Sequence, residues 1–238
     1  MKYDGIFFDS GNTIYRFDQQ GTQDPTSAEV SSGAAARAAT ALRWLGHEVE
    51  DNRVAELLGD WKPLHREVGP AYTEEVLVAH LFEQLGLEMR GDEITYVTGV
   101  FSGPRYRSWL FPGIGETMQQ LADLGLSMGL IANTSVPGWV MDRNFRGVGL
   151  LGFLSVRVYS GDEGVEKPDP EIFRIAEQYS GLAGKRLIYM GDRVDADMAG
   201  AENAGWDSIL FRSVAETSDG RADFEIDSWS ELPGILTR

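Results

Sequence analysis

Four short polar stretches contain the side chains of this sequence that could do chemistry. Three of them supply the acids Asp9, Asp192 and Asp197 and the base Lys167, and the fourth, residues 132–135, offers amide and hydroxyl groups. Carboxylates can act as nucleophiles or bind a hard cation, and a lysine can neutralise anionic oxygens. Each stretch alone also has an ordinary explanation as a turn or a solvated helix. Their common placement after apolar runs makes them candidates for one site.

The apolar runs that precede these stretches predict β-strands. Residues 5–8 form a continuous apolar run that stops at Asp9, which is typical of a parallel strand buried on both faces. The pattern recurs at residues 126–132, 154–159, 186–190 and 207–211, with helical stretches between the recurrences. The alternation predicts an α/β fold with a doubly wound (Rossmann-like) parallel sheet. Sites of such sheets lie beyond the carboxyl ends of the strands.

Residues 17–107 break the alternation and contain helical patterns only. Helices are predicted at residues 27–45, 51–68, 73–86 and 92–109. We expect the Val97-Thr98-Gly99 segment to interrupt the last of these. The sequence therefore predicts a core of residues 1–16 and 108–238 and an all-helical cap, residues 17–107, inserted after the first strand.

Together, and in this order on a βα frame, the four stretches resemble the motifs of the haloacid dehalogenase superfamily of hydrolases, most of which are phosphatases. The resemblance covers residues 5–16 and 109–236, and it includes Phe111-Pro112-Gly113 and a closing strand at residues 222–226. The predicted insertion matches the superfamily's helical cap in position and helicity. The resemblance implies a phosphatase that works through an aspartyl-phosphate.

The resemblance also implies a role for each motif residue. Asp9 is the expected nucleophile, and Lys167 is expected to hold both the carboxylates and the phosphate. Mg²⁺ is expected on Asp9, the backbone carbonyl of Gly11 and Asp192, with Asp197 behind them. Phosphate binding falls to the loop of Ala132 and Asn133 together with Lys167.

Electrostatics supports this expectation of a metal ion. Two like charges about 4 Å apart repel by roughly 4 kcal/mol even at an effective dielectric constant of 20. Carboxylates clustered with a phosphate dianion therefore need cations, and Mg²⁺ is a hard cation that one or two carboxylates can hold. Phosphoryl transfer itself depends on positioning and on neutralising the charge of the equatorial oxygens.

Two positions depart from the usual motifs of that superfamily. Gly11 stands where a second Asp normally protonates the leaving alcohol and later activates water, and neither Ser10 nor Asn12 has a suitable pKa for that work. Such general acid–base catalysis contributes about 10²–10⁴-fold. Ala132 stands where a Ser or Thr normally donates a hydroxyl to the phosphate, a bond that contributes about 1.5–3 kcal/mol. We expect poor leaving groups to suffer most.

These departures leave other functions open. The chain could bind metal and phosphate without turnover, or it could cleave carbon–halogen or carbon–phosphorus bonds, because the superfamily's dehalogenases and phosphonatases also lack the second Asp. Dehalogenases, however, work without Mg²⁺ and lack the complete Gly-Asp-x-x-x-x-Asp of residues 191–197. A phosphonatase needs a lysine in the cap for its Schiff base, and Lys62 is the one lysine in the insertion.

Substrate contacts are expected from the cap and from the segment after the nucleophile. Polar and aromatic residues near predicted breaks in the helices are the candidates, and ordinary packing is the competing explanation: Arg16, Trp61, His65, Arg66 and Tyr72.

Composition narrows the function classes. The 238 residues are 42% hydrophobic and 24% charged, as in a globular protein, and no apolar run approaches the roughly 18 residues of a membrane span. A net charge of −16 disfavours nucleic acid and anionic membranes as partners. The absence of cysteine excludes disulfides and thiolate sites, and an acid before any apolar stretch argues against a signal peptide. We expect a cytoplasmic enzyme that acts on a small phosphorylated metabolite; the oligomeric state cannot be predicted.

Overall fold

A parallel sheet forms the centre of the computed structural model, which describes residues 2–17, 22–59, 68–212 and 218–237. Six strands of these residues pair in the order β3-β2-β1-β4-β5-β6, every pair parallel. The strands are β1 Gly5–Phe8, β2 Ser127–Ala132, β3 Val156–Tyr159, β4 Leu187–Gly191, β5 Asp207–Phe211 and β6 Phe224–Ile226. The predicted doubly wound α/β fold is confirmed, and the predicted strand ends differ by at most two residues.

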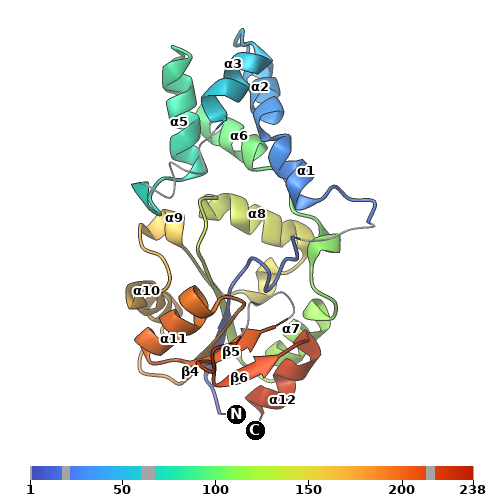
Figure 1. Ribbon diagram of the computed structural model, residues 1–238, viewed down its shortest axis with the longest axis vertical. Helices are drawn as coiled ribbons and strands as arrows, with labels where there is room; N and C mark the ends of the chain where they lie inside the picture. The colour runs from blue at the N-terminus through green and yellow to red at the C-terminus, as the bar shows by residue number, and fades with distance from the viewer. Residues whose placement is uncertain (1, 18–21, 60–67, 213–217, 238) are drawn as a thin grey trace.

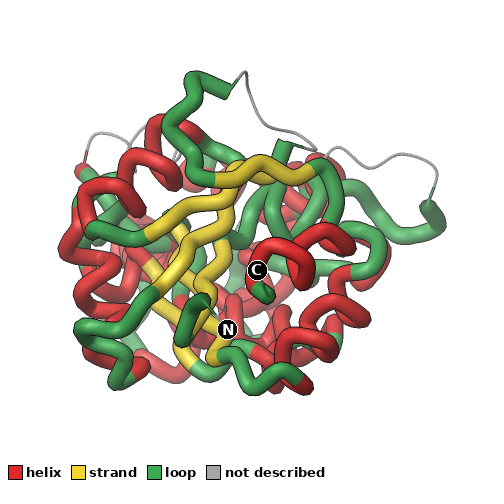
Figure 2. The backbone as a smooth tube through the Cα atoms, turned by 90° about the horizontal axis from the view of Figure 1, so that it is seen from below, coloured by secondary structure: helices red, strands yellow, loops and turns green. Residues whose placement is uncertain are grey.

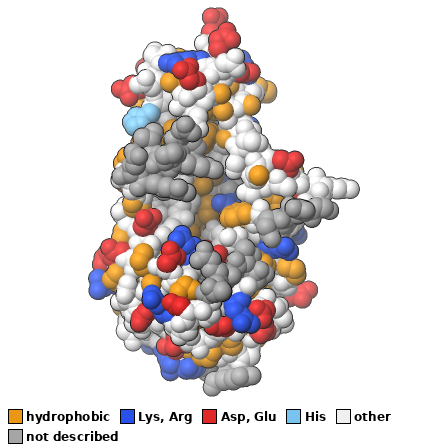
Figure 3. All heavy atoms as spheres, viewed as in Figure 1, with side chains coloured by type: hydrophobic (Ala, Val, Ile, Leu, Met, Phe, Trp, Pro, Cys, Tyr) orange, Lys and Arg blue, Asp and Glu red, His pale blue; other side chains and the backbone are white. Residues whose placement is uncertain are grey.

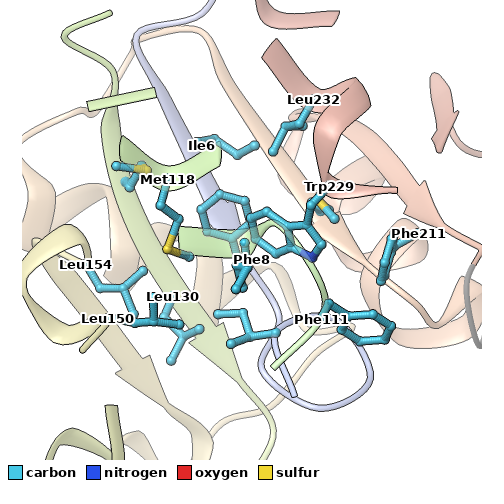
Figure 4. Close-up of a cluster of buried hydrophobic side chains, with 14 of the residues drawn as sticks. Ile6, Phe8, Phe111, Met118, Leu130, Leu150, Leu154, Phe211, Trp229 and Leu232 are labelled. Atoms are coloured by element: carbon cyan, nitrogen blue, oxygen red, sulfur yellow. The ribbon is translucent and has the colours of Figure 1, made fainter. Parts of the chain in front are cut away.

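The first strand is buried on both faces, as its continuous apolar run predicts. Ile6 and Phe8 point into one hydrophobic cluster, where the Phe8 ring lies 5.0 Å from that of Trp229 (Figure 4). Phe7 points into a second cluster on the other face, 5.1 Å from the ring of Trp206. Because both faces are covered, the strand needs no polar alternation.

Helices cover both faces of the sheet (Figure 2). The helices of the core are α7 Ile114–Asp123, α8 Gly138–Val148, α9 Ser160–Glu163, α10 Pro170–Ser180, α11 Ala199–Ala204 and α12 Leu232–Leu236, with short helical turns η1 Arg107–Trp109, η2 Leu151–Phe153, η3 Val194–Met198 and η4 Trp229–Glu231. Among the described residues, none of the helices has both the length and the apolar character that crossing a membrane requires.

A separate group of helices stands above the carboxyl edge of the sheet (Figure 1). These helices are α1 Ser27–Ser32, α2 Ala34–Trp44, α3 Asp51–Leu58, α5 Glu74–Gln84 and α6 Gly91–Ser102. Residues 38–101 supply a hydrophobic cluster of their own, with Leu42, Val78 and Phe82 fully buried. The arrangement agrees with a helical cap, while the predicted domain limits at residues 16/17 and 107/108 stay predictions.

The helices of this group differ from the sequence prediction in three places. The helix predicted at 27–45 is divided at Gly33 into α1 and α2. The helix predicted at 92–109 ends at Ser102, because Gly103 adopts a left-handed φ of 73° and Pro104 follows it. The expected interruption at Val97-Thr98-Gly99 is absent: these residues are buried inside α6. Of the helix predicted at 51–68, residues 60–67 lie outside the described residues.

The order of the strands brings the polar stretches together. Phe8 is in register with Leu130 of β2 on one side and Met190 of β4 on the other. The strand order reverses at β1, so the residues that follow β1, β2 and β4 meet at one switch point, where sites of such sheets form.

Candidate active site

The ammonium group of Lys167 is the centre of the site. Lys167 comes from the loop between α9 and α10 and is 4% exposed. Its Nζ donates to Oδ1 of Asp9 at 2.7 Å, to Oδ1 of Asp197 at 2.6 Å and to the hydroxyl of Tyr189 at 2.6 Å. An ammonium group has three N–H donors, and all three are used here. The lysine is therefore held in one orientation between two carboxylates.

The side chain of Asn133 holds the backbone of this lysine. Its Oδ1 accepts from the Lys167 backbone N–H and its Nδ2 donates to the Lys167 carbonyl, both at 2.9 Å. Asn133 thus joins the end of β2 to the Lys167 loop. The expected contact of Asn133 with phosphate remains a prediction, and it falls on the backbone amide because the side-chain amide is bonded to Lys167.

Asp197 uses both carboxylate oxygens within the protein. Oδ1 accepts from Lys167, and Oδ2 accepts from the backbone N–H of Arg193 at 3.0 Å. The side chain is 2% exposed and lies in the η3 turn, directly after the loop that carries Asp192. These bonds suit a residue that orients the lysine and the loop, as the sequence prediction has it, rather than a direct metal ligand.

Two carboxylates of the site, Asp9 and Asp192, could hold a metal ion, with the hydrogen-bonded Asp197 behind them. Oxygens of Asp9, Asp192 and Asp197 lie within 4.8 Å of one another, and a pocket of about 170 Å³ is lined by these three residues together with Gly11, Asn12, Asn133, Lys167, Arg193 and Ala196. With all groups ionised, three negative charges face the single positive charge of Lys167, so the cluster carries −2. Oxygen ligands and a twofold negative excess fit a divalent hard cation such as Mg²⁺.

The pKa values reflect this crowding of carboxylates. Burial raises the pKa of Asp9 to about 6, although the charge of Lys167 acts in the opposite direction. Burial, the charge of Asp9 and that of Asp197 raise the pKa of Asp192 to about 7, while a hydrogen bond from Asn12 lowers it. For Lys167, burial would lower the pKa, but Asp197 and Asp9 outweigh it and the pKa is raised. Lys167 therefore stays charged, but its single positive charge does not balance the negative charges of the three carboxylates.

The space beside Gly11 is filled by an aromatic ring. A Cβ atom built on Gly11 would lie 3.0 Å from Cε2 of Phe17. The Phe17 ring is itself held edge-on against Trp109 at a centroid distance of 6.4 Å. An acid at position 11 would therefore require the Phe17 ring to shift. The packing of this ring thus agrees with the absence of a general acid–base group at this position.

The loop after β2 offers few free donors. Ala132 is buried at the end of the strand, and the Thr134 backbone N–H donates to Oγ of Ser160 at 2.9 Å. The Thr134 hydroxyl accepts from the backbone N–H of Val136 at 3.0 Å. Neither group replaces the hydroxyl that is missing at Ala132, so the predicted role of this loop in phosphate binding stays a prediction.

Two of the predicted substrate residues, Arg16 and Tyr72, are described, and neither is among the residues that line the pocket. The guanidinium of Arg16 lies over the ring of Phe111, 5.6 Å from its centroid. Tyr72 is buried in the helical group, where its hydroxyl lies 3.3 Å from Nδ1 of His80. Their roles in substrate binding remain predictions. Three further candidates lie outside the described residues, as does the lysine that phosphonatase chemistry would need: Trp61, His65, Arg66 and Lys62.

Three residues around the site escaped the sequence analysis. Tyr189 donates to the carbonyl of Ile131 at 2.8 Å while it accepts from Lys167, yet its position inside an apolar strand reads as packing. Asn12 adopts a φ of 51° and its side chain hydrogen-bonds Asp192. Asn is enriched in this left-handed conformation, so the presence of an Asn in the turn was the signal that the sequence offered. Arg105 lies in the segment between α6 and η1, which was predicted to be helical.

The fold and the site together define a class of α/β enzymes that build their site on carboxylates and a lysine at the carboxyl ends of parallel strands. The family follows from the sequence. Residues 3–205 match the model of the haloacid dehalogenase-like hydrolases, so the chain belongs to that family.

Individual relatives carry phosphatase names. The chain is 33% identical over 133 residues to a glyceraldehyde 3-phosphate phosphatase of Methanopyrus kandleri, covering 53% of this chain and 56% of that one. It is 22% identical to a ribulose-1,5-bisphosphate 5-phosphatase of Halopiger xanaduensis over 98% of both chains. The chain therefore spans about half the length of the first relative and nearly all of the second.

A solved structure shows the same fold in an enzyme with different chemistry. The 2-haloacid dehalogenase of Pseudomonas syringae pv. tomato superposes with a TM-score of 0.65 at 20% identity, covering 99% of both chains. At this identity the likeness concerns the fold alone, so the chemistry has to be argued from the site.

Proposed function

We propose that the protein is a Mg²⁺-dependent phosphatase that acts on a small phosphorylated metabolite through an aspartyl-phosphate on Asp9. One observation carries the proposal: a fully bonded Lys167 ammonium ties Asp9 to Asp197 beside a pocket that Asp192 also lines. The phosphatase names of the two relatives support a phosphate ester as the substrate class. The cytoplasmic location remains a prediction.

The proposed reaction has two displacements at phosphorus. A carboxylate oxygen of Asp9 forms a bond to phosphorus while the bond from phosphorus to the leaving oxygen breaks, and the electron pair leaves with that oxygen. Water then forms a bond to the phosphorus of the aspartyl-phosphate while the bond from phosphorus to the Asp9 oxygen breaks, so that Asp9 leaves as a carboxylate and the two protons of the water remain on the released phosphate. Lys167 holds one Asp9 oxygen throughout, so the other oxygen is the attacking one.

The metal ion would be held by Asp9, Asp192 and the backbone carbonyl of Gly11. Bound there, Mg²⁺ would supply positive charge to the phosphoryl oxygens. Lys167 supplies the remaining positive charge, and Asp197 keeps the lysine in place through its Oδ1. Asn133 fixes the lysine loop against the end of β2.

The leaving group determines which substrates react well. No side chain exists at position 11 to protonate the leaving oxygen, and the Phe17 ring occupies the adjacent space. General acid–base catalysis contributes about 10²–10⁴-fold in enzymes that have it. Acyl and aryl phosphates, whose leaving groups are stable as anions, should therefore react much faster than alkyl phosphates.

Phosphate release with and without metal tests the proposal. We expect Mg²⁺-dependent hydrolysis of p-nitrophenyl phosphate and of acyl phosphates, and a rate on simple alkyl phosphates lower by about 10²-fold or more. Asp9→Asn should abolish turnover. Asp195→Asn is the matched control, because Asp195 lies in the η3 turn with Asp197, is exposed and pairs with Arg193. Undiminished turnover by Asp9→Asn would remove Asp9 from the mechanism.

A second candidate is a protein that binds metal and phosphate without turning over. The Phe17 ring against Gly11 and the bonded side chain of Asn133 favour it, since both remove groups that catalysis would use. Calorimetry with Mg²⁺ and inorganic phosphate, run beside the ester assays, separates the two: binding with no release from any ester indicates the binder. Halide release from haloacids without metal would instead indicate the carbon–halogen reaction.

A further inference from the structure

Arg105 is a cation stacked on two aromatic rings near the nucleophile loop. It lies between the end of α6 and η1, in the segment that leads from the helical group back to the core. Its guanidinium lies 4.9 Å from the ring centroid of Tyr15 and 5.2 Å from that of Phe17. Cation–π contacts of this kind hold the planar group in place while leaving its edge donors unused.

The donors of this guanidinium lack good partners among the described residues. Nη1 is shielded from solvent and donates to no acceptor there, and Nη2 donates only to the sulfur of Met141, at 3.8 Å. The described part of the chain contains no carboxylate within salt-bridge distance of Arg105. Burial accordingly lowers the pKa of its guanidinium.

Two other arginines between the helices and the core behave differently. Arg37 donates to the carbonyls of Val100, Val30 and Phe101, and Arg143 donates to those of Gly99 and Gly103. Both are structural, since backbone carbonyls satisfy their donors. Arg105 lacks this compensation, and a donor that is shielded from solvent without an acceptor, as its Nη1 is, is unfavourable.

The position of Arg105 relates it to the catalytic pocket. The Phe17 ring on which it stacks is the ring that fills the space beside Gly11, and Gly11 lines the pocket. Asp9 is among the negative charges that act on the guanidinium. The hydroxyl of Tyr15, the other ring of the stack, is also buried without a partner among the described residues. On the face seen in Figure 3, basic and hydrophobic atoms lie in the recess between the helical group and the core.

We propose that Arg105 binds a second anionic group of the substrate, a carboxylate in the first instance, while the phosphoryl group lies against Asp9. This inference rests on the proposed function, because it assigns the far end of the same substrate. A guanidinium offers two parallel N–H donors that match the two oxygens of a carboxylate, and the unused Nη1 together with the Tyr15 hydroxyl provide such donors. The anion would also neutralise the charge of the guanidinium and give Nη1 an acceptor.

A pair of esters that differ by one charge tests the inference. Carboxymethyl phosphate and carbamoylmethyl phosphate have nearly the same size and leaving oxygen, so the ratio of their kcat/KM values isolates recognition of the carboxylate. We expect the protein to favour the carboxylate by about tenfold or more. Arg105→Met should reduce the ratio to about one. Arg105→Lys, which keeps the positive charge but loses the two parallel N–H donors of the guanidinium, should give an intermediate ratio.

The control removes an equal charge two residues away. Arg107 is exposed in the same connecting segment, and Arg107→Met should leave the ratio unchanged. Ethane-1,2-diyl bisphosphate forms a third arm: a preference for it over the carboxylate that Arg105→Met also removes would support the same site with phosphate as the second anion. A ratio that Arg105→Met leaves unchanged would overturn the inference and make Arg105 a packing residue.

The same pair tests the inference if turnover itself fails. Calorimetry with Asp9→Asn and Mg²⁺ measures the affinity for each ester without hydrolysis. A tenfold tighter binding of the carboxylate that Arg105→Met abolishes supports the anion site even for a protein that releases no phosphate. Equal affinities for the two esters in this assay would reject the site independently of the proposed catalysis.

Discussion

The two sides of the pocket are built differently. On the side of Lys167, every donor of the ammonium group has an acceptor and both oxygens of Asp197 are bonded. On the side of Gly11, an aromatic ring takes the place of a side chain that could exchange a proton. The first side suits attack and charge neutralisation, while the second lacks the groups that assist departure of a poor leaving group.

For the proposed phosphatase, this difference separates two parts of the chemistry. Positioning and electrostatics supply most of the catalysis of phosphoryl transfer, and both come from the Lys167 side. A proton donor lowers the barrier by a further 3–5 kcal/mol or so, and that contribution depends on the Gly11 side. The following changes, from the largest expected effect to the smallest, are chosen to separate the two sides.

Replacing Lys167 should have the largest effect. Lys167→Met leaves Asp9 and Asp197 buried without a cation, and breaking a buried pair in this way costs about 3–5 kcal/mol. We expect turnover of p-nitrophenyl phosphate to fall by about 10³-fold. We also expect the thermal midpoint to drop more at pH 8 than at pH 5, because the pKa of Asp9 is raised to about 6 and this group is mostly protonated at pH 5. Lys185→Met, an exposed lysine, is the control. Equal loss of stability at both pH values would contradict the charge argument.

Binding of Mg²⁺ should depend steeply on pH. Asp9 and Asp192 have pKa values raised to about 6 and about 7, so the metal has to displace protons below pH 7. Affinity measured by calorimetry should weaken by about tenfold to thirtyfold from pH 8 to pH 6. Without metal, these two groups make the free energy of unfolding fall as pH rises from about 4 to 7, because their pKa values are higher in the folded chain than in the unfolded chain. An ordinary carboxylate, whose pKa is lowered by folding, has the opposite effect.

Asp192→Asn sharpens this measurement. It removes the group with the higher pKa, so the release of protons on metal binding near pH 7 should disappear together with most of the affinity. Buffers of different ionisation enthalpy report the number of protons released. Proton release that persists unchanged in the variant would mean that another group titrates there.

The sequence was sufficient for the parts that depend on local pattern. The strands followed from apolar runs, and Asp9, Asp192 and Asp197 were expected together because the ends of neighbouring parallel strands meet at one edge. The contact of Lys167 with Asp9 followed from the family resemblance. These features repeat a simple rule, in which an apolar run is followed by a polar stretch.

Other features depend on contacts that no local pattern encodes. Phe17 reaches Gly11 because the chain turns back after residues 13–15, and Tyr189 reaches Lys167 from inside a strand that is apolar throughout. The helix predicted to reach Trp109 was wrong beyond Ser102, although Gly103 and Pro104 carried the signal for its end. Because of that error the sequence analysis passed over Arg105, whose guanidinium lies over the rings of Tyr15 and Phe17.

Restoring the acid should test the Gly11 side. Gly11→Asp alone should gain nothing, because its Cβ would meet the Phe17 ring at 3.0 Å. In the background of Phe17→Ala, the same substitution should raise turnover of alkyl phosphates by about tenfold relative to Phe17→Ala alone, with little change for p-nitrophenyl phosphate. An equal gain on both substrates would show that the new carboxylate does not act as the missing proton donor.

The smallest change concerns the hydroxyl of Tyr189, which accepts from Lys167 and donates to Ile131. Tyr189→Phe leaves one N–H of the ammonium and one carbonyl without partners, while the ring stays packed against Phe173. Each hydrogen bond is worth about 0.5–1.5 kcal/mol, so kcat/KM for p-nitrophenyl phosphate should fall by about twofold to tenfold. The fall should be the same for alkyl phosphates, because the hydroxyl orients Lys167 and touches no leaving group. A selective loss on alkyl phosphates would instead assign Tyr189 to the side of the pocket that handles the leaving group, and the division between the two sides would not hold.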